Sequence, residues 1–357
     1  MERRYKVPLL FLFLIVGGIF LSGLSVNFVL NGVINRFIRN GIMVLALIVP
    51  IKAGMGLNFS VTVGAMCAQV GYIMALALGL TSFSGSALAL VGSLVLAVIV
   101  GWFIGLALNR VRGKEMIATM IIGLLANGIY QLIFLTCVGD IIPVRNTSII
   151  LSRGIGVRNT VDLKVFRGLL DNLGVVTLFG IRLPLVMIAI VICFGCCLYY
   201  LLNTPFGRKI KCVGDSIEKS QQVGIFADKI RLKSMIVSTV IAAVGHFVYL
   251  QNIGMLNVYT GHLKHEIFAS AALMAGGATI KDATVRQGFV GLVLFHALFI
   301  VSPQAGQALF NNPALGEYFR SFVAYGTIAF ALIINSEDKK RADVARKPIV
   351  EYSDVNM

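Results

Sequence analysis

The amino-acid sequence predicts an all-α integral membrane protein with about ten transmembrane helices (eight to ten) and both termini in the cytoplasm. Of its 357 residues, 57% are hydrophobic and only 13% are charged, whereas soluble domains carry about 25% charged residues. The mean hydropathy is +0.87. The apolar residues form long continuous runs, unlike the alternating strands of an outer-membrane barrel. These observations exclude a soluble domain, a disordered chain and a membrane barrel.

The apolar runs can be drawn as ten spans, since about 20 apolar residues cross a bilayer. They cover 8–30, 42–57, 60–80, 86–109, 116–138, 183–202, 234–255, 266–280, 288–303 and 318–335. With the N-terminus inside, the cytoplasmic segments hold 20 Lys or Arg and the external side holds 10. This asymmetry predicts that orientation. The net charge of +15 is therefore explained by membrane topology and anionic lipid, and no nucleic-acid partner is expected.

The chain starts with a basic segment, and the apolar run that follows is too long for a signal peptide and lacks a cleavage site. We therefore expect a first span and no cleavable signal. Three of the six cysteines, Cys193, Cys196 and Cys197, are close together without a histidine or acidic neighbour. They are expected to be small buried hydrophobic residues, and neither a metal cluster nor a disulfide framework is indicated.

Two of the ten segments are poor membrane helices. The second contains Pro50 and Lys52, and the eighth is about 14 residues long with Gly276 and Gly277 inside it. Short spans interrupted by Gly or Pro in two halves of a chain indicate a transport pathway. Close packing of small residues between helices explains them equally well, and both interpretations stay open.

Two segments between spans are long: 139–182, expected outside, and 203–233, expected in the cytoplasm. The second contains the signature of a short helix, with Asp215 as its N-cap and Glu218 three residues later. Gly224 is expected to end that helix in a left-handed conformation. A two-turn helix is marginal alone, so it is expected to dock on a partner. A self-packed surface loop is the alternative.

The motifs of several chemistries are absent from the sequence. None of the sixteen acidic residues lies in the middle of an apolar run, where a proton-coupled carrier needs one. Sodium coupling through backbone and hydroxyl oxygens stays open. Gly113-Lys114 lacks the flanking residues of a phosphate-binding loop, and no nucleophile elbow or HExxH motif occurs. We therefore expect no enzyme and no cofactor bound by this chain.

Several polar residues lie within the predicted spans, where they must face the protein interior or a wet cavity. Six of them are predicted to line a translocation pathway: Asn58, Gln69, Asn127, Gln131, His246 and Gln251. Taken singly, each is also explained as a hydrogen bond between helices. His262, His265 and Glu266 are close together at an external span end, where polar groups that reach the interface are a better explanation than a metal site.

Four stretches resemble one family, the permease subunits of bacterial ATP-binding cassette (ABC) importers for ribose and related sugars, branched-chain amino acids and nucleosides. They are Thr204–Arg208 (TPFGR) with Val213–Asp215 and Gly224–Lys229, Ala269–Gly277 (ASAALMAGG) with Gly288–Gly291, Ala53–Ser60 with Gly64, and Gly113–Thr119. The second Gly-Gly pair usual in the family is missing from 280–286, and Leu57-Asn58-Phe59 replaces a commoner triplet. These departures leave the subfamily and the solute open.

The resemblance implies a plasma-membrane importer that moves a small polar solute inward by alternating access. A simple sugar or nucleoside is the first expectation, and a branched-chain amino acid the next. A second permease chain, identical or paralogous, would complete the pathway, and separate cytoplasmic ATPase subunits would bind ATP and Mg²⁺. A substrate-binding protein would deliver solute to the external face, including 139–182. The coupling residues would be Gly214, Asp215, Ser216, Glu218, Ser220, Gln221 and Gly224.

The whole chain, 1–357, is expected to form a single transmembrane domain with a cytoplasmic tail at 336–357. Two other functions remain as alternatives. One is a secondary transporter coupled to an ion gradient, which would work without an ATPase subunit. The other is a membrane scaffold without a solute path, which would tolerate apolar replacements at all six predicted pathway residues.

Overall fold

A computed structural model describes residues 6–322 apart from 81, 153, 165 and 167–171, together with 325, 326, 329, 330 and 333. Helices dominate this part of the chain, as the sequence predicts. They are α1 (Lys6–Ser22), α2 (Val26–Ala46), α3 (Ile48–Lys52), α4 (Val61–Ala77), α5 (Ser82–Arg110), α6 (Glu115–Leu132), the π-helix η2 (Ile133–Cys137), the 3₁₀-helix η3 (Thr147–Ile149), α7 (Leu185–Asn203), α8 (Pro205–Asp215), α9 (Ile217–Gln222), α10 (Ala227–Ile253), α11 (His265–Ala275) and α12 (Val285–Phe310). The strands are β1 (Thr160–Asp162), β2 (Val175–Leu178), β3 (Ile181–Pro184) and β4 (Met255–Asn257).

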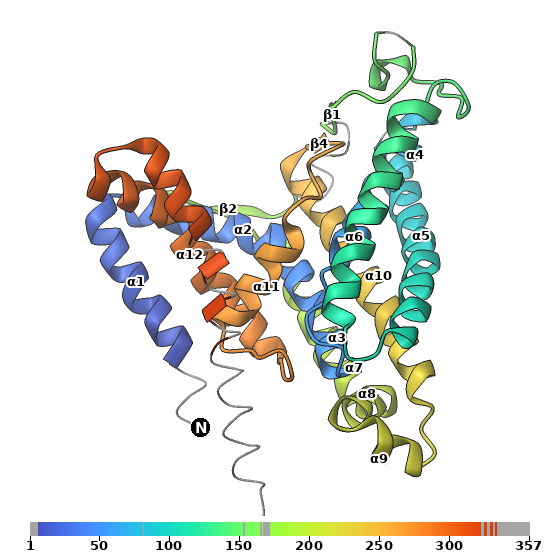
Figure 1. The fold of residues 1–357 in the computed structure, drawn as a ribbon. Coiled ribbons are helices and arrows are strands. Elements are labelled where there is room, and N and C mark those ends of the chain that lie inside the picture. Colours follow the sequence, from blue (N-terminus) through green and yellow to red (C-terminus); the bar gives the residue numbers. More distant parts are fainter. Residues whose placement is uncertain are drawn as a thin grey trace, which may run out of the picture.

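The helices form two groups that α2 and α11 connect (Figure 1). One group is built on α10, which packs against α5, α4 and α2, and the other is the pair α1 and α12. Helices α8 and α9 lie at one end of the molecule, and the pair β1–β4 lies at the opposite end (Figure 1). The two long segments of the sequence, 139–182 and 203–233, therefore project from opposite ends.

Among the described residues, six helices are long and apolar enough to cross a membrane. They are Val26–Lys52, Ser82–Arg110, Glu115–Cys137, Leu185–Asn203, Ala227–Ile253 and Val285–Phe310. Val7–Ser22 and Val61–Ala77 are apolar but shorter. A membrane protein of many helices is thus supported, whereas the prediction of ten spans is not confirmed. The predicted last span, 318–335, is described only in part, with 318–322 helical, and the tail, 336–357, lies outside the described residues.

The predicted first span, 8–30, is wrong because the helix breaks at 23–25. Gly23 has a φ of 63°, a left-handed conformation that ends a helix. Ser25 then caps α2, since its side chain accepts a hydrogen bond from the backbone N–H of Phe28. One apolar run therefore contributes to two helices.

Residues 31–41, which the predicted spans 8–30 and 42–57 leave as an external loop, instead belong to α2, so that loop is also wrong. This helix continues through α3 as one membrane-length unit, Val26–Lys52, and includes the predicted second span only in part. The polar residues of 31–41 favoured a loop in the sequence. In the structure, several of them line a polar cavity between α2, α10 and α11, as polar groups of a membrane helix are expected to do.

Close helix packing in the α10 group depends on small residues. A Cβ atom at Gly101 of α5 would lie 3.0 Å from the Cα of Ile236, and one at Gly105 would lie 3.0 Å from the Cα of Leu232. These two glycines form a G-x-x-x-G pair that brings the backbones of α5 and α10 together, as is common between membrane helices.

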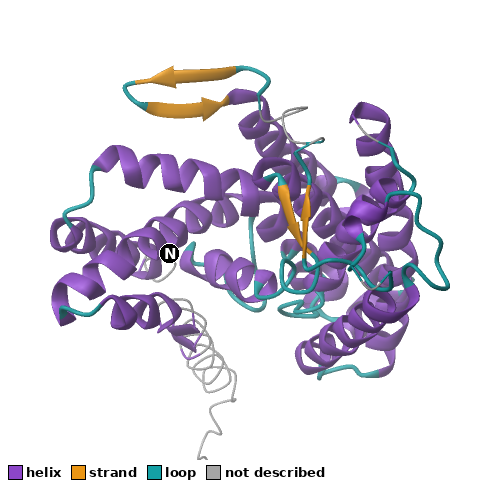
Figure 2. Cartoon of the chain, turned by 90° about the horizontal axis from the view of Figure 1, so that it is seen from above, coloured by secondary structure: helices purple, strands orange, loops and turns teal. Residues whose placement is uncertain are grey.

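Two small antiparallel strand pairs complete the fold (Figure 2). In one pair, Thr160 of β1 is opposite Asn257 of β4, so the long segment 139–182 is attached to the connection after α10. The other pair, β2 with β3, lies at the periphery (Figure 2). The predicted burial of Cys193, Cys196 and Cys197 is wrong, because all three are exposed on α7, as suits a lipid-facing helix.

Candidate functional site

The amide of Gln69 is the centre of a buried polar network. Gln69 is on α4 and has no exposed surface. Its amide lies 2.8 Å from the hydroxyl of Tyr130 on α6, 3.1 Å from Nδ1 of His262 and 3.3 Å from Nε2 of His246 on α10. With the amide nitrogen turned towards Tyr130 and His262, it donates to both, and the amide oxygen accepts from Nε2 of His246. One side chain thus links α4, α6, α10 and the connection that follows α10.

The network continues through His262 to two more of the predicted pathway residues. Nε2 of His262 lies 2.8 Å from Oδ1 of Asn127, which also accepts a hydrogen bond of 3.2 Å from Gln131. Burial, and secondly the nearby His265, lowers the pKa of His262 to about 4. The ring is therefore neutral at pH 7, with one N–H to donate to Asn127 and one nitrogen to accept from Gln69.

Four predicted pathway residues, Gln69, Asn127, Gln131 and His246, are thus brought together. The connecting residue, His262, was expected to reach the interface at a span end, and the structure instead buries it completely. Its position in a short connection gave no sequence signal of burial.

The other two predicted pathway residues lie apart from this network. Asn58 precedes α4, and its side chain donates to Ser238 of α10 over 3.2 Å. Gln251 of α10 donates to Ser86 of α5 over 3.2 Å. Both are at most 2% exposed. In this conformation they make hydrogen bonds between elements, and a translocation role for any of the six stays a prediction.

A polar cavity of about 470 Å³ lies between α2, α10, α11 and the connection from β4 to α11. None of the six predicted pathway residues lines it. Its lining consists of Gly32, Asn35, Arg36, Arg39, Asn40, Tyr249, Asn257, Thr260, Gly261, Leu263, His265 and Phe268. The sequence did contain a signal, because Asn31, Asn35 and Arg39 follow one another at a spacing of four, which places polar residues on one helical face.

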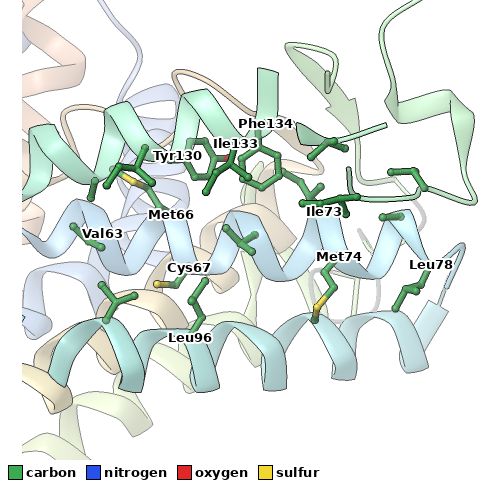
Figure 3. Close-up of a pocket in the computed structure, with 18 of the residues that line it drawn as sticks. Val63, Met66, Cys67, Ile73, Met74, Leu78, Leu96, Tyr130, Ile133 and Phe134 are labelled. Atoms are coloured by element: carbon green, nitrogen blue, oxygen red, sulfur yellow. The ribbon is translucent and has the colours of Figure 1, made fainter. Parts of the chain in front are cut away.

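A second cavity is apolar and about 750 Å³ in volume. It lies between α4, α5 and α6, and Figure 3 shows Met66, Cys67, Met74, Leu96, Tyr130 and Phe134 around it. Val63, Cys67, Val70 and Met74 recur at a spacing of three or four on α4, so one face of that helix is apolar, while Gln69 points to the polar network. Among the described lining residues, only Tyr130 and Cys67 carry a polar side-chain group, and the hydroxyl of Tyr130 is bound to Gln69, so the cavity suits an apolar molecule better than a hydrophilic solute.

The predicted short helix of segment 203–233 exists as α9, preceded by α8. Asp215 is not its N-cap, because it is the last residue of α8. Ser216 takes that place, and its side chain accepts from the backbone N–H of Lys219. A serine hydroxyl is as good a cap as a carboxylate, and the extended backbone of Ser216 (φ −163°) marks the break between the two helices.

The C-terminal end of α9 agrees with the prediction for Gly224. Its φ is 78°, its N–H donates to the carbonyl of Gln221, and the N–H of Ile225 donates to the carbonyl of Ser220. These two hydrogen bonds form a Schellman motif. Two apolar side chains close to Gly224 in the chain are exposed: Val223 is 69% and Phe226 is 71% exposed.

The predicted coupling residues differ in accessibility. Asp215, Glu218, Gln221 and Gly224 are exposed. Ser220 is fully buried and donates to the carbonyl of Ile217, so its side chain faces this chain rather than a partner.

The end of α8 is attached to the end of α3. A Cβ at Gly214 would overlap the carbonyl oxygen of Lys52 and lie 3.1 Å from the nitrogen of Gly54. Lys52 in turn forms an ion pair with Asp282 in the connection between α11 and α12. The two segments that flank the polar cavity, α2–α3 and α11, are therefore both connected to α8 at this end.

A buried ion pair fixes α10 beside this junction. Arg231 is 1% exposed, and its guanidinium lies 2.6 Å from the carboxylate of Glu115 at the start of α6. It also donates to the side chain of Asn109 over 3.2 Å and to the carbonyl of Leu108. The ends of α5, α6 and α10 are thereby held together. Among the described residues, no group of three His, Cys, Asp or Glu side chains is arranged to hold a metal ion.

Comparison with known proteins gives a family and several relatives. A family model described as "Branched-chain amino acid transport system / permease component" matches residues 29–332. The autoinducer 2 import system permease protein LsrC of Photorhabdus laumondii is 30% identical over 136 residues, 38% of each chain. The xylose transport system permease protein XylH of Haemophilus influenzae is 26% identical over 162 residues, 45% of this chain and 41% of the relative. These two alignments cover about two fifths of each relative.

A longer alignment is found with LsrC of Yersinia pseudotuberculosis serotype O:1b, which is 25% identical over 275 residues, 76% of this chain and 69% of that one. No solved structure matches. The family is one of transport permeases rather than enzymes, and the resemblance seen in the four sequence stretches is confirmed. Because the family model extends over most of its length, the chain belongs to the family of permease components of branched-chain amino acid transport systems.

Proposed function

We propose that this chain is the membrane subunit of an ABC importer that moves a small polar solute into the cell by alternating access. Two kinds of relative support a sugar-like solute, since one is named for import of autoinducer 2 and another for transport of xylose. The family description supports a branched-chain amino acid as the next choice. A simple sugar or nucleoside is the proposed solute class.

The observation that carries the proposal is the capped helix α9 at one end of the molecule (Figure 1). Six residues are too few for an independent helix, yet both ends of α9 are capped and its outer surface is exposed. Val223 and Phe226 beside it leave apolar surface uncovered, which suits insertion into a partner. We propose that the ATPase subunit binds here, through Gln221, Val223 and Phe226 in place of the buried Ser220.

The attachment of α8 to α3 supports a route for coupling. Gly214 meets the backbone of Lys52, and α3 continues α2, whose side chains line the polar cavity. Lys52 also forms an ion pair with Asp282, which lies just before α12. A displacement of α8 by the ATPase would therefore move both walls of the cavity together. Close backbone contact transmits displacement because packed elements do not deform continuously.

The remaining partners follow from this assignment. ATP and Mg²⁺ would be bound by the ATPase, and a second permease chain, identical or paralogous, would complete the pathway. A substrate-binding protein would approach the end that carries 139–182, since α8 and α9 lie at the opposite end (Figure 1). The proposed topology places both termini and the tail 336–357 in the cytoplasm of a bacterial cell, and the chain in its plasma membrane.

The experiment is a pull-down of the tagged chain from its native membrane in mild detergent, followed by mass spectrometry. The proposal predicts an ABC ATPase subunit among the co-purifying proteins. Phe226→Asp should abolish its recovery, because a charge would replace the exposed apolar side chain at the docking surface. Phe179→Asp is the matched control, since Phe179 is 92% exposed in the turn between β2 and β3. Recovery of the chain without an ATPase would favour the secondary transporter or the scaffold.

A further inference from the structure

We propose that an anionic phospholipid binds at the corner between α7 and α8, with an acyl chain in a groove on α7 and its headgroup beside Arg208 and Lys209. This surface is separate from the residues assigned above to coupling and to the translocation pathway. The inference does not require the importer function, because it needs only that α7, a helix of membrane length, crosses the bilayer.

The corner between α7 and α8 is a fixed turn. Thr204 caps both helices. Its hydroxyl donates to the carbonyl of Leu201 over 2.6 Å and accepts from the backbone N–H of Gly207. A Cβ at Gly207 would overlap the backbone of Leu202, so the first turn of α8 packs directly on the last turn of α7. Side chains on the two sides of the corner therefore keep a defined position relative to one another.

A groove of about 640 Å³ lies on the exposed side of this corner. Tyr199 and Tyr200 are 66% and 75% exposed beside it, and tyrosines are typical of the membrane interface. Cys197 is six residues from the end of α7 at Asn203, which is about 9 Å along the helix. The groove therefore extends from the interface into the hydrocarbon region. Its lining consists of Cys196, Cys197, Tyr200, Leu201, Thr204 and Phe206.

Two basic side chains follow the groove at the start of α8. Arg208 comes four positions after Thr204 of the groove, and Lys209 comes three positions after Phe206. Each basic residue is thus one helical turn from a groove residue on the same face. Both are exposed. Among the described residues, no carboxylate forms an ion pair with either of them. The end of the groove is therefore positively charged.

Helix α8 has the pattern of a helix at a membrane surface. Ile210 is fully buried against the chain, whereas Arg208 and Lys209 are exposed. Lys211 adds a third positive charge near the corner, since its Nζ donates over 3.5 Å to Oδ1 of Asn203 at the end of α7. A basic polar face of this kind attracts anionic headgroups. Guanidinium and ammonium groups bind phosphate oxygens through charge-assisted hydrogen bonds.

An anionic phospholipid matches the apolar groove and the basic residues together. A soluble anion would contact the basic residues and leave the groove unused. A zwitterionic lipid would fill the groove but carry its own ammonium beside the arginine and lysines. Residues 204–214 contain three basic residues and no acidic residue, so a net negative headgroup is favoured. Because Gly214 at the far end of α8 contacts Lys52, a lipid at the corner would also stabilise the position of α8.

The test compares phosphatidylglycerol and phosphatidylcholine that carry the same diazirine-labelled acyl chain. Each probe is added at the same mole fraction to phosphatidylcholine nanodiscs that hold the full chain, and mass spectrometry locates the attachments after illumination. We expect phosphatidylglycerol to label residues 196–206 about 10-fold more than phosphatidylcholine does, since each basic residue near an anionic headgroup contributes roughly 5-fold in affinity. The exposed face of α6, where Leu124 is 64% and Leu125 is 63% exposed, is the internal control and should be labelled equally by both.

A charge-removing variant assigns the preference to the basic residues. Arg208→Gln combined with Lys209→Gln should lower the ratio of the two probes at 196–206 to about 2 or less. Arg110→Gln combined with Lys114→Gln is the matched control, because it removes the same charge from exposed positions at the same end of the molecule (Figure 1). The control should retain the ratio. Equal labelling of α6 in both variants shows that each is embedded in the bilayer as the unmodified chain is.

Equal labelling of 196–206 by the two probes, or an equal loss of preference in both variants, would overturn the inference. The alternative occupant of the basic surface is an acidic surface of a partner protein. An unchanged probe ratio in the Arg208 and Lys209 variant, together with loss of the co-purifying ATPase, would assign the surface to that partner and also overturn the inference. The labelling requires no ATPase, so a chain that labels as expected but co-purifies without an ATPase would overturn the importer function alone.

Discussion

Gly214 of α8 lies directly against Lys52 of α3, with no room for a side chain between the two backbones. The contact joins a segment that the sequence assigns to the cytoplasm with a helix unit that crosses the molecule to the polar cavity. Lys52 extends the connection through its ion pair with Asp282. A mechanical link of this kind is what an importer driven by a separate ATPase requires.

Replacing Gly214 with alanine should push α8 away from α3. The new Cβ would overlap the carbonyl of Lys52, and forced overpacking typically costs about 1–3 kcal/mol. Thermal unfolding of the purified chain measures that cost, and uptake by the reconstituted importer should fall. Gly128→Ala is the control, since a Cβ there meets nothing within 4 Å. Equal uptake by the two variants would show that the contact does not transmit motion.

Replacing Gly224 with valine should uncouple ATP hydrolysis from uptake while the membrane fold remains. The left-handed conformation, φ 78°, costs a β-branched residue about 1–3 kcal/mol, so the end of α9 would rearrange. A Cβ at this position has nothing within 4 Å, which confines the effect to the local backbone. Gly224→Asn, which tolerates the left-handed region, should retain most uptake. Normal uptake by the valine variant would remove α9 from the coupling mechanism.

Glu115→Gln should destabilise the chain strongly, because it would leave the charge of Arg231 buried without its counter-ion. Removing one partner of a buried pair costs about 3–5 kcal/mol. Asp228→Asn breaks the exposed pair with Arg112 and should cost less than about 1 kcal/mol. Unfolding of the two variants in the same detergent compares them. Similar losses would mean that the Arg231 pair contributes no more than a surface ion pair.

The stability of the chain should decrease between pH 7 and pH 5 through His262. Burial lowers the folded-state pKa of this group from 6.5 to about 4, so the unfolded chain binds more protons between these values. Its contribution is therefore complete above pH 6.5 and is lost as the pH falls towards 4. The cost of His262→Gln should be roughly 2 kcal/mol smaller at pH 5 than at pH 7. A cost that is independent of pH would contradict the neutral, buried ring.

The sequence predicted those features that depend on local patterns. Apolar runs predicted the membrane class, and Gly224 predicted the end of α9, because a left-handed residue at a helix terminus requires little tertiary context. Asp215 and Ser216 show the limit of such patterns. The two residues are adjacent, and both are good N-caps. Only the packing of α8 decides which of them caps the next helix.

The candidate site was harder to predict because polar residues in a membrane protein have two possible surroundings. Asn35, Arg36 and Arg39 suggested a loop between two spans, whereas they belong to α2 and line a cavity between helices. His262 suggested a polar span end, whereas it is buried against Gln69 and Asn127. Hydropathy measures how polar a segment is, and it does not show whether water or another helix satisfies the polar groups.

The most direct test of the account is site-specific photo-crosslinking from the exposed surface beside α9. A benzoylphenylalanine introduced at Val223, at Phe226 or at the control position Phe179 would be activated in native membranes, and the attached protein identified by mass spectrometry. The account predicts that positions 223 and 226 crosslink to an ABC ATPase subunit and that position 179 does not. Crosslinks from 223 and 226 to lipid or to this chain alone would contradict the proposal that an ATPase drives this permease.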